Sequence, residues 1–226
     1  MSVIDVIKGG LIVSCQALED EPLHGAEIMA AMANAAKKGG AVGIRANGSE
    51  DIKAIKEKVD LPVIGIDKNN EYDSKIYITP TIKEAGEIAR AGAEIIAVDA
   101  TGRLRPGGLR LKEYFEQIRS RFDVAIMGDI STFEEGQKAR ECGADLIGTT
   151  LSGYTEYSRQ QDGPDFILLE KLVKNLDIPV IMEGKISRPE EVKKALELGA
   201  WAVVVGTAIT RPQVITKWFS RVAENS

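Results

Sequence analysis

One pattern occurs four times in this chain of 226 residues: an alanine-bearing helical stretch leads into Gly-Ala and then into an apolar strand. The repeats are marked by Gly40, Gly92, Gly143 and Gly199, which lie 52, 51 and 56 residues apart. That spacing is twice the length of one strand-plus-helix unit. A further unit must therefore lie between each pair of glycines, and strands and helices are predicted to alternate throughout the chain.

Eight apolar runs have the length of a strand and are separated by stretches with helical apolar spacing. The runs are continuous, not alternating, which is typical of parallel strands covered on both faces. Eight such units predict an α/β fold, a single-domain (β/α)8 TIM barrel over residues 1–226. The rival fold, a doubly wound open sheet, normally has only about five or six strands. The predicted strands are residues 11–14, 41–44, 63–66, 95–98, 125–127, 146–148, 180–182 and 202–205.

The composition indicates one globular domain with a small-molecule ligand. Hydrophobic residues make up 44% and charged residues 28% of the chain, and no low-complexity segment or linker divides it. A net charge of -5 argues against a general nucleic-acid surface. Residues 1–8 are too short and too polar for a signal peptide or a membrane span, so we expect a cytoplasmic protein that binds neither nucleic acid nor membrane.

The cysteine and histidine content excludes several kinds of catalytic site. Cys15 and Cys142 show no CxxC spacing and no disulfide framework, so we expect both to be reduced. His24 is the only histidine, and the chain therefore cannot build a His-rich metal centre. The sequence thus predicts no metal site.

Active sites of TIM barrels lie where the strands end and the following loops begin. At these places the chain carries an unusual number of charged and amide side chains. A single charge just past a strand is more often a solvated loop residue or a helix cap, but convergence on one rim favours a functional site. The candidate residues are Gln16, Arg45, Asp67, Lys68, Asp99, Asp129, Thr149, Thr150, Glu183, Gly206 and Thr207.

Three of these residues suggest acid–base chemistry. Lys68 could act as a Schiff-base nucleophile or, with its pKa lowered by burial, as a proton acceptor, although it could also be a surface lysine. Glu183 follows an apolar run and could orient a ligand or shuttle protons. The guanidinium of Arg45 suits oxygen-rich groups, and its alternative role is to pair with Asp67 or Glu183.

The loops after the seventh and eighth predicted strands occupy the place where many barrels hold a phosphate. Gly184 and Lys185 lie in the first loop, and Gly206 and Thr207 lie in the second. A helix that opened near Thr210 would add unpaired amides, and Arg211 could clamp the anion. Ordinary turn glycines are the alternative reading, but the barrel context favours a phosphate.

Two long polar segments, residues 103–108 and 151–158, are predicted to cover the site, because loops of this length usually serve it. Tyr157, in the second segment, is included among the expected substrate-binding residues. The role of Asp99 stays open between a site residue and a buried hydrogen-bond anchor. Residues 76–79 resemble an additional short strand that leads into the next helix.

Taken together, these residues resemble the bacterial N-acetylmannosamine-6-phosphate 2-epimerases from about Gly10 to Pro212. The resemblance implies a phosphosugar-binding TIM barrel of the ribulose-phosphate-binding-barrel type. It further implies an isomerase of amino-sugar and sialic acid catabolism that inverts carbon 2 of N-acetylmannosamine 6-phosphate, giving N-acetylglucosamine 6-phosphate, with no cofactor. Its carriers are residues 10–17, 39–47, 64–68, 129–131, 148–154 and 183–184.

On this family pattern, Lys68 takes and returns the carbon 2 proton while Glu183 orients the sugar and assists proton movement. Gln16, Arg45 and Asp129 are then expected to hold the acetamido and hydroxyl groups. Lysine must be neutral to accept a proton, and the sequence leaves its charge balance open. The chain departs from the pattern at Met127-Gly128, Asn69-Asn70 and Glu156, which are neighbours of the proposed catalytic residues or lie in a rim loop.

Two rival classes of function remain at this stage. One is a Schiff-base lyase that uses Lys68 on a phosphosugar, and the other is a catalytically silent phosphosugar-binding barrel. We also expect a homodimer, because apolar residues late in the chain, among them Trp218 and Phe219, could pack on a second subunit.

Overall fold

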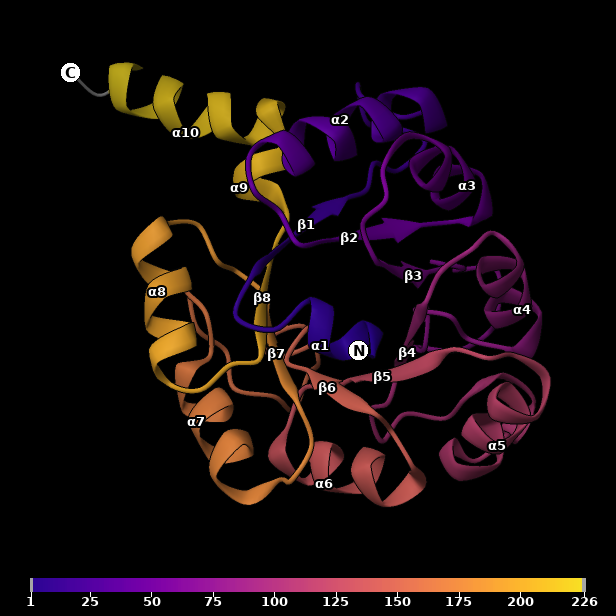
Figure 1. Cartoon of the computed structure of the whole chain (residues 1–226). Coiled ribbons are helices and arrows are strands. Elements are labelled where there is room, and N and C mark those ends of the chain that lie inside the picture. Colours follow the sequence, from indigo (N-terminus) through magenta and orange to yellow (C-terminus); the bar gives the residue numbers. More distant parts are fainter. Residues whose placement is uncertain (1, 225–226) are drawn as a thin grey trace.

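The computed structural model describes residues 2–224, so residues 1 and 225–226 of the predicted domain lie outside the described residues. Eight parallel strands follow one another in chain order and close into a barrel (Figure 1). This confirms the predicted (β/α)8 TIM barrel. The strands are β1 (Leu11–Cys15), β2 (Gly43–Asn47), β3 (Val63–Ile66), β4 (Ile95–Asp99), β5 (Ala125–Asp129), β6 (Leu146–Gly148), β7 (Val180–Glu183) and β8 (Ala202–Val205).

Helices surround the barrel in the order in which they occur along the chain (Figure 1). No helix within residues 2–224 combines the length and the apolar character needed to cross a membrane. The helices are α1 (Val3–Val6), α2 (Ala26–Lys38), α3 (Ser49–Lys58), α4 (Ile82–Arg90), η1 (Pro106–Gly108), α5 (Leu111–Arg121), α6 (Phe133–Cys142), α7 (Phe166–Asn175), α8 (Pro189–Glu197), α9 (Thr207–Thr210) and α10 (Pro212–Glu224).

Two apolar clusters explain why the strands read as continuous hydrophobic runs. One fills the barrel with side chains such as Ile64, Met127 and Ile181, and the other lies between the strands and the surrounding helices. Seven strands contribute residues to both clusters, while β2 contributes Ile44 and Ala46 to the second one and buries Arg45 on its other face. Both faces of the strands are therefore buried. Helix α1 lies over the amino-terminal end of the barrel (Figure 1), which leaves the opposite end for a site.

Strand boundaries differ from the predicted ones where charged residues lie inside strands. β2 runs over Gly43–Asn47 and not over residues 41–44, so Arg45 belongs to the strand and pairs in register with Ser14 and Ile64. Asp129 and Glu183 are the last residues of β5 and β7. The predicted strands end too early because a charged residue was taken to lie outside a buried strand. Arg45, however, forms ion pairs with Asp129 and Glu183, so all three can lie inside strands.

The predicted short strand at residues 76–79 is reduced to one antiparallel bridge between Lys68 and Ile78. The chain turns sharply next to it, since Thr79 has a φ of 46°. Helix α4 then begins as predicted, with Thr81 as its N-cap in a capping box with Glu84. The bridge fixes the backbone at Lys68 on the rim of the barrel.

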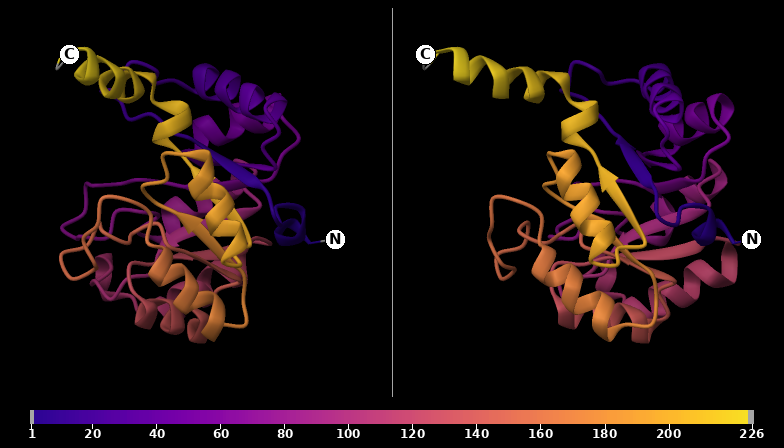
Figure 2. Two further views of the ribbon diagram at one scale, coloured as in Figure 1. Left: turned by 90° about the vertical axis from the view of Figure 1, so that its left-hand side faces the viewer. Right: turned by 60° about the vertical axis from the view of Figure 1, so that its left-hand side comes forward.

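Two further expectations can be compared with the structure. Cys15 and Cys142, which we expected to be reduced, are free cysteines, and both are buried. Helix α10 projects away from the barrel, so Trp218 and Phe219 remain exposed on it (Figure 2).

Candidate active site

A cavity of about 300 Å³ opens at the carboxyl end of the strands. Its wall contains most of the residues predicted from the sequence, although they come from six different strands or the loops that follow them. Convergence from many strands is the usual way in which a TIM barrel builds an active site. The predicted residues that line the cavity are Gln16, Arg45, Lys68, Thr150, Glu183, Gly184, Lys185, Gly206, Thr207 and Arg211.

Arg45 is the electrostatic centre of this cavity. Its side chain is only 1% exposed, and its Nη2 lies 2.5 Å from Asp129 Oδ2 while its Nη1 lies 3.0 Å from Glu183 Oε2. Burial alone would lower the pKa of Arg45, but the two carboxylates outweigh it and raise that pKa above its ordinary value. The guanidinium therefore stays charged inside the barrel.

Glu183 lies between the cavity and this cation. Burial raises its pKa to about 7; Arg45 opposes the shift, and Asp129 adds to it. Although Glu183 Oε2 is close to Arg45, no hydrogen bond from the described residues reaches this buried oxygen. The carboxyl group is therefore near its midpoint at neutral pH, with Oε2 held beside the Arg45 guanidinium.

Lys68 approaches the cavity from the end of β3, which is four strands away from β7 in the closed barrel. Its backbone N–H donates to Asn47 Oδ1 at 2.9 Å, which holds the residue on the rim. Burial lowers the pKa of the Lys68 amine; Arg45 and Arg211 lower it further, while Glu183 and Glu21 oppose the change. The environment thus shifts the balance that the sequence left open toward the neutral amine, relative to an exposed lysine.

Other buried polar atoms in the cavity wall also lack partners. Gln16 donates from Nε2 to Ser14 Oγ at 2.8 Å, but its Oε1 accepts no hydrogen bond from the described residues, and Arg45 Nε donates none to them. Buried polar atoms are rarely left unpaired in folded proteins. Gln16 Oε1 and Arg45 Nε thus form an acceptor and a donor suited to a polar ligand.

The predicted phosphate loops border the same cavity. Gly184 and Lys185 both have left-handed backbone conformations, with φ of 112° and 59°, and such strained turns are concentrated at functional sites. A helix opens next to Thr210 as predicted, since α10 begins at Pro212, and the short helix α9 also begins at Thr207, directly after Gly206. Arg211 lines the cavity while its Nη2 contacts Glu21 Oε2 at 2.7 Å.

Two predicted substrate-binding residues do not line the cavity. Asp129 lies behind Arg45 and also accepts a hydrogen bond from Thr150 Oγ1 at 2.6 Å, so it supports the wall. The structure does not bring Tyr157 to the cavity, because its hydroxyl donates to Glu135 Oε1 at 2.7 Å. The tyrosine of this loop that lines the cavity is Tyr154.

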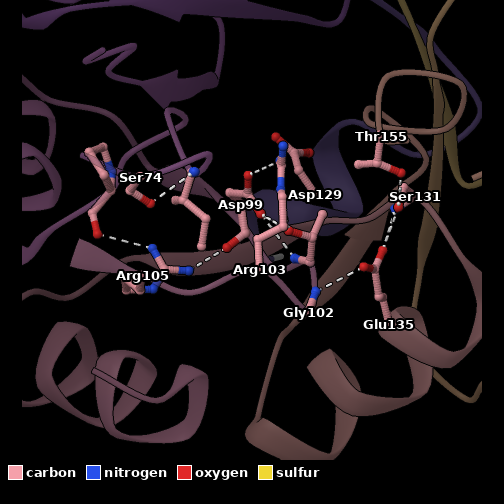
Figure 3. Close-up of polar contacts among 12 residues, drawn as sticks. Ser74, Asp99, Gly102, Arg103, Arg105, Asp129, Ser131, Glu135 and Thr155 are labelled. Carbon is pink, nitrogen blue, oxygen red and sulfur yellow. Dashed lines mark hydrogen bonds and ion pairs between the residues drawn. The ribbon is translucent and has the colours of Figure 1, made fainter. Parts of the chain in front are cut away.

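Asp99, whose role the sequence left open, is a buried anchor. It accepts a hydrogen bond from Thr101 Oγ1 at 2.6 Å and pairs with Arg103 Nη2 at 2.5 Å, and it lies beside Asp129 at the ends of β4 and β5 (Figure 3). These bonds fix the loop after β4. Tyr77 and Ser14, which the sequence analysis did not propose as site residues, do line the cavity.

Within residues 2–224, no group of three or more histidine, cysteine, aspartate or glutamate side chains is arranged to hold a metal ion. The charged groups of the cavity are instead Arg45, Lys68, Glu183, Lys185 and Arg211. Four of the five are basic residues, an excess of positive charge that suits a phosphorylated ligand.

Comparisons with known proteins agree on one family. Residues 29–225 match the family described as "Putative N-acetylmannosamine-6-phosphate epimerase". Two relatives carry the name "Putative N-acetylmannosamine-6-phosphate 2-epimerase". The relative in Clostridioides difficile strain 630 is 56% identical over 98% of this chain and 99% of its own length. The relative in Clostridium perfringens strain SM101 is 58% identical over 96% of this chain and 98% of its own length.

Solved structures give the same result. A structure reported for the N-acetylmannosamine-6-phosphate 2-epimerase from Clostridium perfringens matches with a TM-score of 0.95 and 56% identity, covering 98% of this chain and 96% of that one. A thiamine phosphate pyrophosphorylase from Pyrococcus furiosus shares only the fold, with a TM-score of 0.62 and 18% identity over 92% of this chain and 90% of its own. The chain belongs to the N-acetylmannosamine-6-phosphate 2-epimerase family.

Proposed function

We propose that this chain is an isomerase that interconverts N-acetylmannosamine 6-phosphate and N-acetylglucosamine 6-phosphate by removing and returning the proton on carbon 2. The observation that carries the proposal is the shared cavity of Lys68 and Glu183, with the buried Arg45 beside them. The family and its relatives at 50–58% identity support the reaction. The roles of individual residues rest on geometry and charge.

Lys68 is the proposed base that takes the carbon 2 proton. The environment lowers its pKa, so a larger fraction of the amine is neutral at the working pH than for an exposed lysine. Removal of the carbon 2 proton spreads negative charge onto an oxygen of a neighbouring carbon. A fixed cation can stabilise this charge as it forms. Arg45, held by Asp129, is already in place and charged.

Glu183 is proposed to orient the sugar and to assist proton movement from the opposite side of the cavity. Its pKa of about 7 allows it to accept or donate a proton near neutral pH. Gln16 offers an unpaired carbonyl oxygen to an acetamido N–H or a hydroxyl group. We propose that Gly184, Lys185, Gly206, Thr207 and Arg211 hold the phosphate, since they combine basic side chains with backbone that a dianion can approach closely.

The test is to incubate the purified protein with N-acetylmannosamine 6-phosphate and follow the sugars by NMR. Formation of N-acetylglucosamine 6-phosphate supports the proposal, and the absence of any second sugar overturns it. Borohydride treatment with substrate separates the rival classes, because only a Schiff-base lyase would be trapped as a covalent adduct at Lys68. A silent phosphosugar-binding barrel would bind the sugar and give neither result.

We also propose that the protein is a cytoplasmic homodimer. Two buried free cysteines fit a reducing compartment. Helix α10 projects from the barrel and leaves Phe219 74% exposed and Trp218 41% exposed, an apolar surface that a second copy would cover (Figure 2). Sedimentation analysis should give a dimer for the native chain and a monomer for Phe219→Asp; a native monomer would contradict the dimer.

A further inference from the structure

The loop between β6 and α7, residues 149–165, carries a residue that the sequence analysis did not propose for the site. Tyr154 lines the cavity beside Glu183 and Lys185. The Lys185 Nζ atom lies 5.3 Å from the centre of its ring. Burial and the nearby Glu183 raise the pKa of Tyr154, in agreement with this placement. A loop of this kind can hold such a residue against a ligand only if the loop itself is fastened.

Two side chains that follow Tyr154 in the loop fasten it to the beginning of α6. Thr155 Oγ1 donates to Ser131 Oγ at 3.0 Å, as Figure 3 shows, and the Tyr157 hydroxyl donates to Glu135 Oε1 at 2.7 Å. Both contacts end on one cluster, because Ser131 in turn donates to Glu135 (Figure 3). The position of Tyr154 therefore depends on Glu135, although Glu135 does not line the cavity.

Glu135 joins three rim loops through one buried carboxylate. Glu135 is 8% exposed, and its carboxylate accepts five hydrogen bonds. Oε2 accepts from the N–H and hydroxyl of Ser131 and from the N–H of Thr132, at 2.7 to 3.1 Å. Oε1 accepts from the Gly102 N–H at 2.9 Å and from Tyr157. The loops after β4, β5 and β6 thus meet at this residue.

We propose that Glu135 is a positioning residue for the epimerase reaction: with Tyr157 as its tether, it holds Tyr154 in place to bind the phosphosugar. The inference rests on the proposed function. All five hydrogen bonds to the Glu135 carboxylate come from N–H or O–H donors, so only a side chain that accepts on both oxygens satisfies them. Glutamine has one accepting oxygen, which satisfies most donors when it faces the three of the α6 cap; its NH2 group then faces the Gly102 N–H and the Tyr157 hydroxyl and weakens the loop tether.

Tyr157→Phe is the sharpest perturbation, because it removes one hydroxyl and leaves the cap of α6 intact. Losing a hydrogen bond to a buried carboxylate should raise KM for N-acetylmannosamine 6-phosphate by about five- to tenfold, with kcat changing less. Glu135→Gln should do the same. Adding Tyr157→Phe to Glu135→Gln should have little further effect, because both changes break one contact.

Glu191→Gln is the matched control. Glu191 is the third residue of α8, as Glu135 is the third residue of α6. Its Oε2 accepts hydrogen bonds from the N–H and hydroxyl of Ser187 and from the N–H of Arg188. It reproduces the capping contacts of Glu135 without joining the loop after β6. Its substitution should lower the melting temperature while kcat and KM stay within about twofold of the native values.

Limited trypsin digestion gives a readout that does not depend on activity. Arg159 lies in the same loop with 54% of its side chain exposed. Cleavage after Arg159 should be several-fold faster in Tyr157→Phe than in the native chain or Glu191→Gln, and N-acetylmannosamine 6-phosphate should slow it. Unchanged KM and unchanged cleavage in Tyr157→Phe would overturn the inference while native activity persists. An inactive native protein would instead overturn the proposed function.

Discussion

Replacing Arg45 by methionine should destabilise the protein strongly, because it leaves two carboxylates facing one another inside the barrel. Arg45 is 1% exposed, Asp129 is 0% exposed and Glu183 is 13% exposed, and the guanidinium contacts both acids. Removing one partner of a buried ion pair costs about 3–5 kcal/mol. For a domain of this size each kcal/mol corresponds to about 2–4 °C, so the melting temperature should fall by about 6–20 °C.

The matched control is Arg140→Met. Arg140 also makes two contacts with carboxylate oxygens, both of Asp177, at 2.7 and 2.5 Å, but the two side chains are 44% and 67% exposed. Solvent screening makes such a pair weak, so the melting temperature should change by less than about 2 °C. Melting followed by circular dichroism tests both variants. Equal shifts would refute the argument that burial makes the Arg45 contacts important.

The effect of Arg45→Met should also depend on pH. Arg45 opposes the rise in the pKa of Glu183, so its removal should raise that pKa beyond about 7. At pH 5.5 Glu183 would then be protonated, and the cost of losing the cation should be smaller than at pH 8. A larger loss of stability at pH 5.5 than at pH 8 would contradict this account.

Three further predictions concern single groups in the cavity. Lys68→Gln should lower kcat by about 10²–10⁴-fold with little change in the Kd for the phosphosugar, measured by steady-state kinetics and calorimetry. The pKa of Glu183 is raised, so native stability should fall as pH rises from 4.5 through about 7; Glu183→Gln should flatten that slope in urea denaturation. Gly184→Ala should raise KM about tenfold, because alanine is strained at a φ of 112°.

Each of these predictions has a contradicting result. Near-native kcat in Lys68→Gln would exclude its amine as the base. A pH slope that is the same in Glu183→Gln and the native protein would place the titrating group elsewhere. An unchanged KM in Gly184→Ala, with unchanged stability, would show that the backbone at this turn does not contact the phosphate.

The sequence was sufficient to predict the barrel, because a parallel strand that is buried on both faces appears in the sequence as a continuous apolar run. Lys68 and Glu183 were predicted for the same reason: a polar residue at the carboxyl end of an apolar strand has to lie on one rim of a closed barrel. Their shared cavity follows from topology alone. The predicted limits of β2 were wrong, since nothing local shows that Arg45 is neutralised by side chains 84 and 138 residues away.

The choice between Tyr154 and Tyr157 could not be made from the sequence. Both residues lie in one irregular loop, where no helical or strand period fixes the direction of a side chain. Tyr157 points to Glu135 because a long-range hydrogen bond holds it there, and Tyr154 points to the cavity as a consequence. The pKa direction of Lys68 was also out of reach, because it depends on the summed effect of Arg45, Glu183, Arg211 and burial.

Exchange of the carbon 2 proton with solvent tests the central claim most directly. The native protein and Lys68→Gln are incubated with N-acetylmannosamine 6-phosphate in heavy water, and carbon 2 of both sugars is followed by NMR. The account predicts that the native protein places deuterium at carbon 2 as N-acetylglucosamine 6-phosphate accumulates, and that Lys68→Gln places none. Formation of N-acetylglucosamine 6-phosphate with only protium at carbon 2, or undiminished exchange in Lys68→Gln, would contradict it.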